Sequence, residues 1–459
     1  MSLVVETVNP ATGEKLATYR GMSAEEAGKI AKEVRTAQEG WKKLQLPDRC
    51  ARLLGLARAL RDRKDEFARL ITAEMGKPIT QSETEIEKCA WGAEVYAQNA
   101  EKWLEEEKIA TDAKLTYVTF EPLGTVLSIM PWNFPFWQAL RFAIPAVTAG
   151  NTLLLKHASI CTGSSLAIES LFRDAGFPEN CFRSLIVGHE VIAGLIAGPL
   201  VQGVSLTGSV EAGERIGALA GANLKKFVLE LGGSDPFVVL EDADIQAAAK
   251  TAADARLVNS GQSCIASKRF IIHRAVADEF VERMVSEFAK KRVGDPMDRR
   301  TDVGPLVSKA QVKVVADQME DAISKGASVM FGRGPIDGPG AFFEPTILTG
   351  VKTDMRVWNQ EVFGPLAPVV LAQDEEEAIR MANSSDFGLG ASLWTRKMER
   401  ARRLSGLLEC GMVFVNSLVK SDPRVPFGGS KKSGVGRELS KYGLKEFVNV
   451  KAVSVFSAD

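Results

Sequence analysis

The sequence predicts an α/β protein built on parallel sheets. Three observations support this prediction: helical patterns fill the first hundred residues, short apolar runs alternate with helix-length segments from Val126, and a second alternation starts near Pro236. Strands that are separated by helices pair in parallel, because a parallel pair needs a long crossover connection. We therefore expect a doubly wound sheet in the first half of the chain and a second α/β unit after it.

Helices are expected across the N-terminal quarter of the chain. Apolar residues recur there at three- and four-residue spacing among Lys, Arg and Glu, which is the pattern of a helix with one buried face. The helices predicted in this way are 24–43, 48–73 and 83–104.

The two alternations supply the strands. In the first, apolar runs of strand length predict strands at 126–130, 152–155, 183–187, 201–206 and 226–229. The second predicts a strand at 236–240, an Ala-rich helix at 245–257, a strand at 269–273, a helix at 276–290, a Gly- and Pro-rich loop at 332–340 and a strand at 368–371. The boundary between the two units is expected between Gly232-Gly233 and Pro236.

Two segments outside these alternations also have the pattern of strands. Residues 114–120 and 447–456 alternate apolar and polar side chains, which is typical of hairpin or edge strands. We expect them to pair with each other or with another subunit.

The composition argues against several classes of partner. The 57 Lys and Arg residues nearly balance 58 Asp and Glu residues, which gives a net charge of −1 with no long run of one sign. Nucleic acid and an anionic membrane surface are therefore not expected as partners. The most apolar stretch, 126–149, contains Pro131, Asn133 and Arg141, so no membrane-spanning segment is predicted.

The first residues and the cysteines predict a cytoplasmic protein. Residues 1–6 lack the basic and apolar segments of a signal peptide. The six cysteines, at positions 50, 89, 161, 181, 264 and 410, have no zinc-type spacing, so no metal is predicted. Scattered free thiols are typical of a reducing compartment.

Cys264 is the cysteine whose setting suggests chemistry. It ends the small, polar segment Asn259-Ser260-Gly261-Gln262-Ser263-Cys264, which follows the Ala-rich helix. Most cysteines are buried structural thiols, but backbone N–H groups exposed by such a loop can stabilise a thiolate. None of the three histidines stands in a protease-like context, so we expect a carboxylate as the base.

Glu230 and a glycine turn stand where open α/β sheets place their sites. Glu230 ends an apolar strand just before two glycines, and partial burial there would raise its pKa toward the range of a general base. Thr207-Gly208-Ser209 follows another strand and opens a helix, where the backbone can approach a pyrophosphate. This segment is not G-x-G-x-x-G, so an ordinary turn remains an equal alternative.

An aromatic loop, Pro131-Trp132-Asn133-Phe134-Pro135, follows the first strand of the first alternation. A tryptophan between prolines most often serves packing. A rigidly held Asn133 side chain, however, can donate a hydrogen bond to a developing oxyanion. Glu361, taken by itself, is interpreted as an ordinary carboxylate in a loop.

Taken in order, these and other motifs resemble those of the aldehyde dehydrogenase superfamily along essentially the whole chain. The matching segments are 9–14, 75–78, 131–135, 206–209, 230–233, 261–264, 361–365, 426–429 and 432–434. The resemblance implies a Rossmann-type cofactor domain (1–110 and 125–233), an α/β catalytic domain (234–435) and a small oligomerisation β-arm (111–124 and 436–459). It also implies a homodimer or a homotetramer, between which the sequence does not choose.

The resemblance assigns catalytic roles to three residues. It implies that Cys264 is the nucleophile, that Glu230 is the general base for hydrolysis, and that Asn133 and the backbone N–H of Cys264 form the oxyanion hole. An aldehyde would be oxidised through a thiohemiacetal and a thioester to a carboxylic acid. Family members that transfer the acyl group to coenzyme A typically lack this glutamate, so its presence favours hydrolysis.

The resemblance also implies a dinucleotide site. The residues expected to hold the dinucleotide are Trp132, Lys156, His157, Ala158, Ser159, Gly208, Ser209, Leu231, Glu361 and Phe363. Where the family commonly has Lys-Pro-Ser-Glu, this chain has Lys-His-Ala-Ser at 156–159. Ser159 removes a carboxylate that would repel a 2′-phosphate, so we expect NADP to be preferred and NAD to be possible.

Arg141 suggests the substrate. It lies eight residues after Asn133 in an apolar helical segment, where a charge needs a partner. A structural arginine is the ordinary explanation, but a guanidinium can also hold a substrate carboxylate bidentately. The surrounding pattern resembles NADP-preferring bacterial and cyanobacterial succinate-semialdehyde dehydrogenases, which implies a pocket formed by Trp137, Arg141, Ser263 and Ser421.

Two alternatives remain open from the sequence. The chain could be a broad-specificity dehydrogenase of aliphatic or aromatic aldehydes, with Arg141 structural. From another class, it could be a catalytically silent structural or binding protein that kept the fold. The intact set of Cys264, Glu230 and Asn133 argues against the second alternative.

Overall fold

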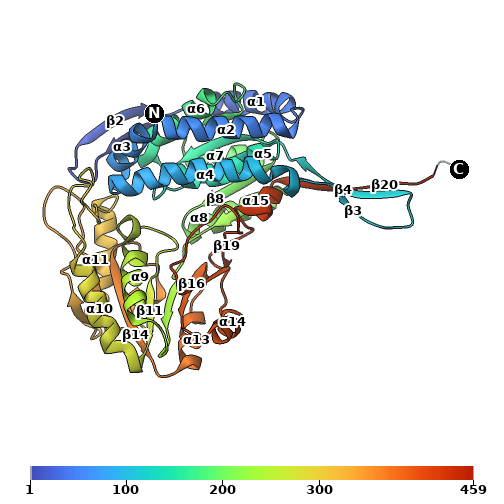
Figure 1. The fold of residues 1–459 in the computed structure, drawn as a ribbon. Coiled ribbons are helices and arrows are strands. Elements are labelled where there is room, and N and C mark those ends of the chain that lie inside the picture. The colour runs from blue at the N-terminus through green and yellow to red at the C-terminus, as the bar shows by residue number, and fades with distance from the viewer. Residues whose placement is uncertain (1–2, 458–459) are drawn as a thin grey trace.

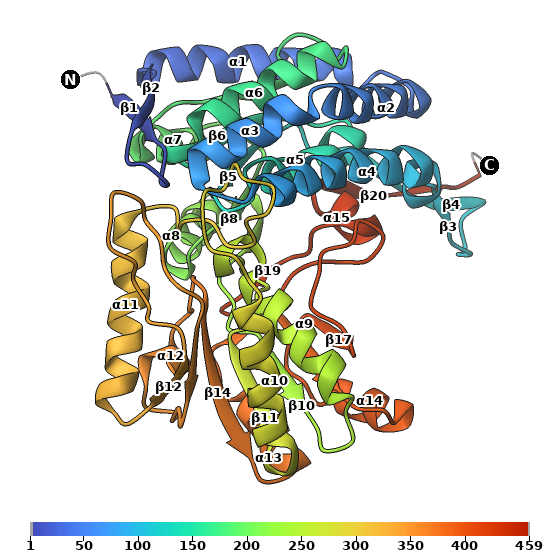
Figure 2. The ribbon, with the colours of Figure 1, turned by 60° about the vertical axis from the view of Figure 1, so that its left-hand side comes forward.

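The computed structural model describes residues 3–457 and consists of two sheet-based halves and a projecting arm (Figure 1). The N-terminal half carries most of the long helices, and the C-terminal half lies below it in this view. Figure 2, turned by 60°, shows the same two halves, and the chain passes from the first to the second after Glu230 and returns to the first at Gly434.

The first half is organised around a six-stranded sheet. The strands, in spatial order, are β19 (Gly434–Val435), β9 (Lys226–Glu230), β8 (Gly203–Thr207), β5 (Thr125–Met130), β6 (Thr152–His157) and β7 (Phe182–Ser184). The five strands from β9 to β7 are parallel, and β19 pairs antiparallel with β9. The strand order reverses between β5 and β8, which is the position where doubly wound sheets bind ligands.

Helices cover both faces of this sheet because alternate strand residues point to opposite sides. Val126 packs in a core with one group of helices, whereas Leu127 packs in a second core with the other group. The first group is α2 (Leu46–Asp62), α3 (Lys64–Met75), α4 (Ile79–Trp103), α5 (Pro135–Thr148) and α6 (Thr162–Asp174). The second is α1 (Ala24–Trp41), α7 (His189–Ala197) and α8 (Val210–Ala222).

The second half contains a seven-stranded sheet that is also mostly parallel. Its spatial order is β12 (Ser328–Phe331), β13 (Thr346–Thr349), β14 (Leu366–Ala372), β11 (Arg269–His273), β10 (Pro236–Val239), β16 (Gly390–Trp394) and β17 (Met412–Val415). Only β12 runs antiparallel to its neighbour. The helices of this half are α9 (Ile245–Leu257), α10 (Ala277–Ala289), α11 (Lys309–Ser324), α12 (Arg356–Asn359), α13 (Glu375–Asn383) and α14 (Met398–Ser405).

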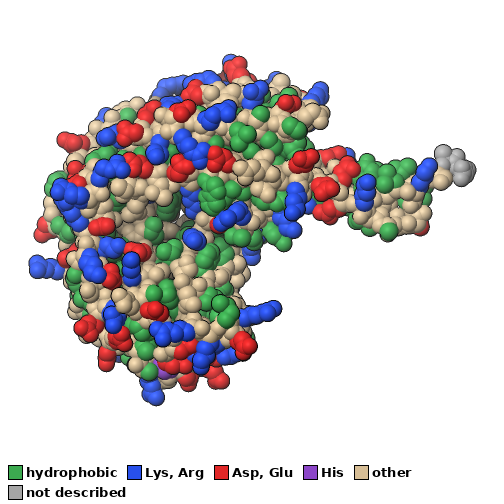
Figure 3. Space-filling model, in the orientation of Figure 1, with side chains coloured by type: hydrophobic (Ala, Val, Ile, Leu, Met, Phe, Trp, Pro, Cys, Tyr) green, Lys and Arg blue, Asp and Glu red, His purple; other side chains and the backbone are tan. Residues whose placement is uncertain are grey.

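The arm is a three-stranded antiparallel sheet that extends away from the body (Figure 1). Its strands are β3 (Glu107–Lys108), β4 (Leu115–Pro122) and β20 (Val448–Val455), and β4 lies in the middle. The two alternating segments of the sequence therefore pair with each other. Figure 3 shows hydrophobic side chains gathered on this arm, whereas Lys, Arg, Asp and Glu are interspersed over the visible face of the body.

Small elements complete the chain. They are the hairpin β1 (Val4–Val8) and β2 (Lys15–Arg20), the pair β15 (Phe387–Gly388) and β18 (Ser430–Lys431), helix α15 (Ser440–Glu446) and the short 3₁₀ turns η1 (Ser159–Cys161), η2 (Val258–Gly261) and η3 (Arg274–Val276). Among residues 3–457, no helix combines the length and the apolar character needed to cross a lipid bilayer.

The structure corrects two of the elements expected from the sequence. The single helix expected at 48–73 is two helices, because the backbone at Arg63 leaves the helical region (φ −108°, ψ 20°) and redirects the chain between α2 and α3. The strand expected at 183–187 ends at Ser184. Beyond it, Ile186 accepts a hydrogen bond from Met22 instead of continuing the sheet.

The domain limits drawn from the sequence stay a proposal. One strand pair and one helix contact bear on them. The chain rejoins the six-stranded sheet at Gly434, before the expected limit at residue 435. Helix α15, assigned from the sequence to the arm, packs against α4 and α5 of the body. The arm as paired strands comprises 107–108, 115–122 and 448–455.

Candidate active site

The loop that carries Cys264 has an unusual backbone. After α9 the chain adopts left-handed conformations at Asn259 (φ 52°), Ser260 (φ 55°) and Gly261 (φ 79°). Such a run is costly for residues with a side chain and persists only where surrounding contacts fix it. At Gly261 even a Cβ atom would lie 2.4 Å from the backbone of Gly364, so only glycine fits.

Two buried side chains fix this loop. Arg256 donates hydrogen bonds to the carbonyl oxygens of Gly261 (2.6 Å) and Ser267 (2.9 Å), which brackets the loop. Asn259 donates from its amide to the carbonyl oxygens of Asn133 (2.7 Å) and Gln262 (3.0 Å). The hydrogen bond from Asn259 to Asn133 ties the loop to the aromatic segment 131–135 from the other half of the molecule.

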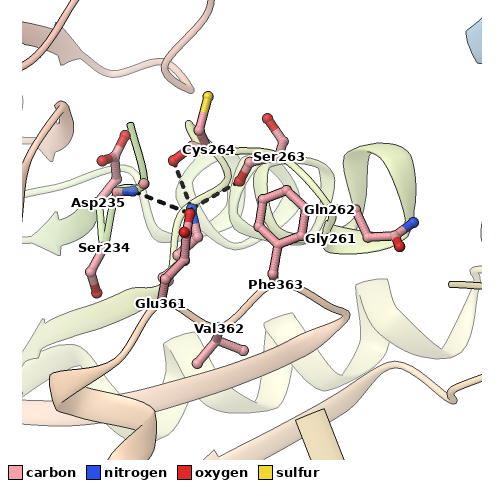
Figure 4. A network of polar contacts seen from close by, with 12 residues as sticks. Ser234, Asp235, Gly261, Gln262, Ser263, Cys264, Glu361, Val362 and Phe363 are labelled. Carbon is pink, nitrogen blue, oxygen red and sulfur yellow. Dashed lines mark hydrogen bonds and ion pairs between the residues drawn. The ribbon is translucent and has the colours of Figure 1, made fainter. Parts of the chain in front are cut away.

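Lys268 orients the peptide groups on either side of Cys264. Its buried ammonium donates to the carbonyl oxygens of Ser263 (2.8 Å) and Cys264 (2.6 Å) and lies 3.4 Å from a carboxylate oxygen of Glu361. In a trans peptide the C=O and N–H point in opposite directions. Holding the Ser263 carbonyl therefore turns the Cys264 N–H away from Lys268. Figure 4 shows the sulfur of Cys264 pointing away from Glu361.

Two glycines bring the end of β9 against this loop. A Cβ atom at Gly233 would lie 2.8 Å from the carbonyl oxygen of Cys264, and one at Gly232 would lie 2.5 Å from a carboxylate oxygen of Glu361. The Gly233 N–H donates to Glu361 at 3.1 Å. Gly233, which lies against the Cys264 loop, is only three residues after Glu230 at the end of β9.

The environments of Glu230 and Cys264 favour their neutral forms. Burial raises the pKa of Glu230 well above its ordinary value, and nearby Glu438 raises it further, against the smaller effect of Arg141. Burial raises the pKa of the Cys264 thiol to about 12, although Arg141 and Lys268 act in the opposite direction. Desolvation therefore outweighs the stabilisation of a thiolate that the polar loop suggested.

A cavity of about 230 Å³ opens beside Cys264. The structure brings the nucleophile candidate and every predicted substrate residue to its wall. The lining includes Cys264, Ser263, Trp137, Arg141 and Ser421, together with Glu85, Lys88, Phe134, Lys420 and Phe427. The indole N–H of Trp137 donates to the hydroxyl of Ser421 at 3.2 Å.

Arg141 has a partner inside the protein. Its guanidinium forms an ion pair with Glu438, stacks over the ring of Phe427 at 4.4 Å, and donates to the Thr207 hydroxyl at 3.4 Å. Both members of the ion pair are almost fully buried. The sequence placed Arg141 without a protein partner, and the structure supplies one from a loop nearly three hundred residues away.

A second, smaller cavity lies at the end of β6, where the sequence places the dinucleotide. Lys156, His157 and Ser159 line it. Lys156 is half-buried, its pKa is lowered by burial, and no ion pair within residues 3–457 involves it. The side chain of Ser159 is exposed, and the N–H of Ala158 donates to Met130.

The remaining cofactor candidates lie on elements that converge at the carboxyl edge of the first sheet. Gly208 follows β8 and donates from its N–H to the backbone carbonyl of Glu230, and Ser209 caps α8 by accepting a hydrogen bond from the N–H of Ala212 at 3.2 Å. Leu231 packs against α8, where a Cβ atom at Gly213 would lie 2.5 Å from it. These contacts leave the N-terminus of α8 open to an anion.

Three of the predicted cofactor residues have contacts that the sequence did not indicate. His157 turns inward, where its ring nitrogen meets the carbonyl of Pro135 at 3.0 Å and burial lowers its pKa to about 4. Only its backbone is then available to a dinucleotide. Trp132 and Phe363 meet edge to face, with ring centroids 5.6 Å apart.

Sequence reasoning missed four residues of this site: Lys88, Lys268, Glu438 and the buried Glu85. The sequence contains a pattern that could have indicated Glu85 and Lys88. Polar residues at 81, 84, 85 and 88 recur at helical spacing, in a segment whose inner face is otherwise largely apolar. No local pattern marks Lys268 or Glu438. Within the described part of the chain, no group of three or more His, Cys, Asp and Glu side chains converges as a metal site requires.

Comparisons with known proteins agree with this geometry. The model described as the aldehyde dehydrogenase family matches residues 2–453. A protein of Synechocystis sp. named "Probable succinate-semialdehyde dehydrogenase [NADP(+)]" is 45% identical over 451 residues, which cover 98% of this chain and 99% of the relative. A Mycobacterium bovis protein named "Succinate-semialdehyde dehydrogenase [NADP(+)] 1" is 42% identical over 452 residues, with 98% and 99% covered.

A solved structure is similarly close. The crystal structure of succinic semialdehyde dehydrogenase from Streptococcus pyogenes in complex with NADP⁺ superposes with a TM-score of 0.96 at 38% identity. The match covers 99% of this chain and all of the other.

The contacts of Lys268 generate a first prediction. Lys268→Met should lower kcat about 10- to 100-fold with little change in KM, because the Ser263 and Cys264 carbonyls lose their donor and the Cys264 N–H loses its fixed direction. Steady-state kinetics and the free energy of unfolding should be measured together. Lys250→Met, an exposed lysine on α9, is the matched control. An unchanged kcat in a folded Lys268→Met protein would contradict the positioning role.

Proposed function

The chain belongs to the aldehyde dehydrogenase family, and we propose that it oxidises succinate semialdehyde to succinate with NADP as the preferred acceptor. The observation that supports this substrate is the cavity beside Cys264, whose walls carry basic side chains and hydroxyl groups. Its buried carboxylate, Glu85, is already engaged by Lys77 and by two N–H groups at the start of α5. The cavity therefore favours an aldehyde that carries an anion.

The reaction begins at Cys264. The thiol loses its proton to solvent, the resulting thiolate adds to the aldehyde carbon, and the oxygen of the thiohemiacetal is stabilised by the Asn133 amide and the Cys264 N–H. In the free protein the Asn133 amide donates to the carbonyl of Gln262 at 3.2 Å, which holds it beside the loop. Loss of hydride from the carbon leaves a thioester on Cys264.

Glu230 completes the cycle. Its carboxylate takes a proton from water, the hydroxide adds to the thioester carbonyl, and cleavage of the C–S bond releases succinate and restores the cysteine. Burial and the nearby Glu438 raise the pKa of Glu230, which favours the protonated form of this side chain in the free protein. Hydrolysis therefore accelerates as the pH rises and the base is freed.

The residues at the edge of the first sheet fit a dinucleotide. When bound, the nicotinamide accepts the hydride that leaves the substrate carbon. Lys156, a half-buried cation without a protein anion among the described residues, suits a phosphate, and the capped N-terminus of α8 suits another. We expect Trp132, Phe363 and Glu361 to contact the dinucleotide near its nicotinamide end, and Ser159 to leave room for a 2′-phosphate.

The arm suits contact with a second copy of the chain. Val450, Val455 and Phe456 are 57%, 44% and 62% exposed, and β20 and β3 are both edge strands. Exposed apolar strands at an open edge are normally covered. We propose a homodimer or a homotetramer assembled through this arm, and a cytoplasmic location in keeping with six free thiols.

The aldehyde preference tests the proposed function against a broad-specificity dehydrogenase. The wild-type protein should show a kcat/KM for succinate semialdehyde at least tenfold above that for butanal, which has the same number of carbons and no charge. Steady-state assays with NADP measure both. Equal values would favour the broad-specificity alternative, and no turnover of any aldehyde would favour a catalytically silent protein.

The roles of Cys264 and Glu230 can be separated kinetically. Cys264→Ala should abolish turnover and retain NADP binding. Glu230→Gln should give a single burst of NADPH and then stop, because acylation needs the thiol whereas hydrolysis needs the base. The steady rate of the wild type should rise with pH above the range in which a solvent-exposed glutamate ionises, because the raised pKa of Glu230 delays its deprotonation. Stopped-flow absorbance follows the burst, and its absence in Glu230→Gln would assign Glu230 to acylation instead.

Cofactor choice is expected to depend on Ser159. The wild type should have a higher kcat/KM with NADP than with NAD as acceptor, and Ser159→Glu should reverse this order because the new carboxylate repels the 2′-phosphate. Ser159→Gln, which has similar size and no charge, is the control. A wild type that uses NAD equally well would refute this account of selectivity.

A further inference from the structure

A fully buried ion pair lies against the start of α5, and the proposed mechanism gives it no role. Lys77 and Glu85 form this pair, and their side chains are 0% and 1% exposed. Lys77 comes from the turn between α3 and α4, whereas Glu85 lies in the second turn of α4. A buried ion pair is weak evidence for stability, because the loss of hydration offsets much of the attraction. The contacts of the pair are therefore more informative than its charges.

Both members of the pair contact the first residues of α5. One oxygen of the Glu85 carboxylate accepts the N–H groups of Phe136 and Trp137, each at 2.9 Å. The other oxygen accepts from Lys77, whose ammonium lies 3.7 Å from the ring centroid of Phe134. The three residues contacted in this way lie within four positions after the proposed oxyanion donor.

Glu85 serves as the cap of α5 although it belongs to another helix. Phe134, at the N-cap, has no hydrogen-bond acceptor in its side chain, and Pro135 has no N–H. The first N–H groups of the helix are therefore those of Phe136 and Trp137, and Glu85 accepts both. The positive end of the helix dipole also favours a carboxylate at this place. The direction in which the chain enters α5 thus depends on Glu85.

Asn133 is held from its other side by the Cys264 loop. Its backbone carbonyl accepts from Asn259 at 2.7 Å, and its amide donates to the carbonyl of Gln262 at 3.2 Å. A side-chain amide has two N–H bonds, so one remains for the oxygen of a substrate. Asn133 therefore lies between the loop that carries the nucleophile and the helix start that Glu85 holds. The direction of its free N–H depends on both.

We propose that the pair of Lys77 and Glu85 positions the Asn133 amide for the aldehyde oxygen by fixing the start of α5. Both side chains act through the backbone of this helix and are positioning residues. This inference rests on the proposed function and deepens it, because it identifies the groups that hold the oxyanion donor in place.

The two charges of the pair depend on each other. Burial lowers the pKa of Lys77, and the carboxylate of Glu85 acts in the opposite direction. Removing one member alone would leave the other charge buried without its counterion, which costs more than removing both. The variants that test the pair therefore neutralise both side chains together.

The test uses two double variants of the full-length protein. The glutamine variant, Lys77→Met with Glu85→Gln, keeps one side-chain oxygen for the N–H groups of α5, whereas the leucine variant, Lys77→Met with Glu85→Leu, removes this acceptor. Each is made in the wild type and in Asn133→Ala. The control is Glu83→Gln, which changes a carboxylate on the same helix that pairs with the exposed Arg299.

Two quantities are measured in each protein: kcat/KM for succinate semialdehyde, and the dissociation constant of NADP from fluorescence quenching. In the wild-type background the leucine variant should lower kcat/KM about 10- to 100-fold, because the oxyanion donor is misdirected. In Asn133→Ala the same variant should lower it less than about twofold, because the donor is already absent. The glutamine variant should lose only about 3- to 10-fold in the wild-type background. NADP binding should stay unchanged, and the control should behave as the wild type.

The outcomes separate this inference from the proposed function. Equal losses of kcat/KM in the two backgrounds would mean that the pair supports the structure rather than the donor, which overturns the inference. An unchanged kcat/KM in a folded leucine variant would overturn it as well. Asn133→Ala with the kcat/KM of the wild type would remove the role on which the inference rests, and a wild type that oxidises no aldehyde would remove the proposed function itself. If the leucine variant does not fold, the glutamine variant gives the same comparison between backgrounds.

Discussion

The close approach of the chain to itself at Gly232 and Gly233 is the constraint on which the catalytic centre depends. These residues lead from the last parallel strand of one sheet to the first strand of the other, and they are threaded between the Glu361 carboxylate and the Cys264 carbonyl. No side chain fits at either position without moving one of these groups. The spacing therefore limits how far the base at the end of β9 stands from the nucleophile in the loop before β11.

Two buried ion pairs lie near this crossing, and each acts on the groups next to it. The Lys77 and Glu85 pair places a carboxylate at the N-terminus of α5, where the helix dipole and two N–H groups stabilise it. The pair of Arg141 and Glu438 lies where its charges act on the pKa of Glu230, and Arg141 also acts on Cys264. Removing Arg141 would leave Glu438 buried beside Glu230, so its loss should disturb chemistry as well as binding.

The sequence predicted well the bounds of those helices and strands whose conformation is determined by local interactions. The helix 245–257 and the strand 269–273 have the same bounds in the structure, because an Ala-rich run and an apolar β-branched run decide their own conformation. The break at Arg63 went unseen since the apolar periodicity continues through it. His157 shows a different limit: its position after β6 is local information, but its inward turn depends on the carbonyl of Pro135 on another segment. Glu438 and Lys268 act through long-range or backbone contacts that no spacing reveals.

The neutral resting forms of Cys264 and Glu230 follow from the same burial that makes the cavity selective. A thiol with a raised pKa exists almost entirely protonated at neutral pH, and the thiolate is the form that reacts with oxidants and alkylating agents. The free protein thus favours the less reactive thiol form of its nucleophile, and Ala266, two residues beyond Cys264, offers no second sulfur with which to form a disulfide. Desolvation, by contrast, strengthens every hydrogen bond to a developing oxyanion. The burial that suppresses the thiolate in the resting state is therefore also what makes the hydrogen bonds from Asn133 and the Cys264 N–H act most strongly once a substrate is bound.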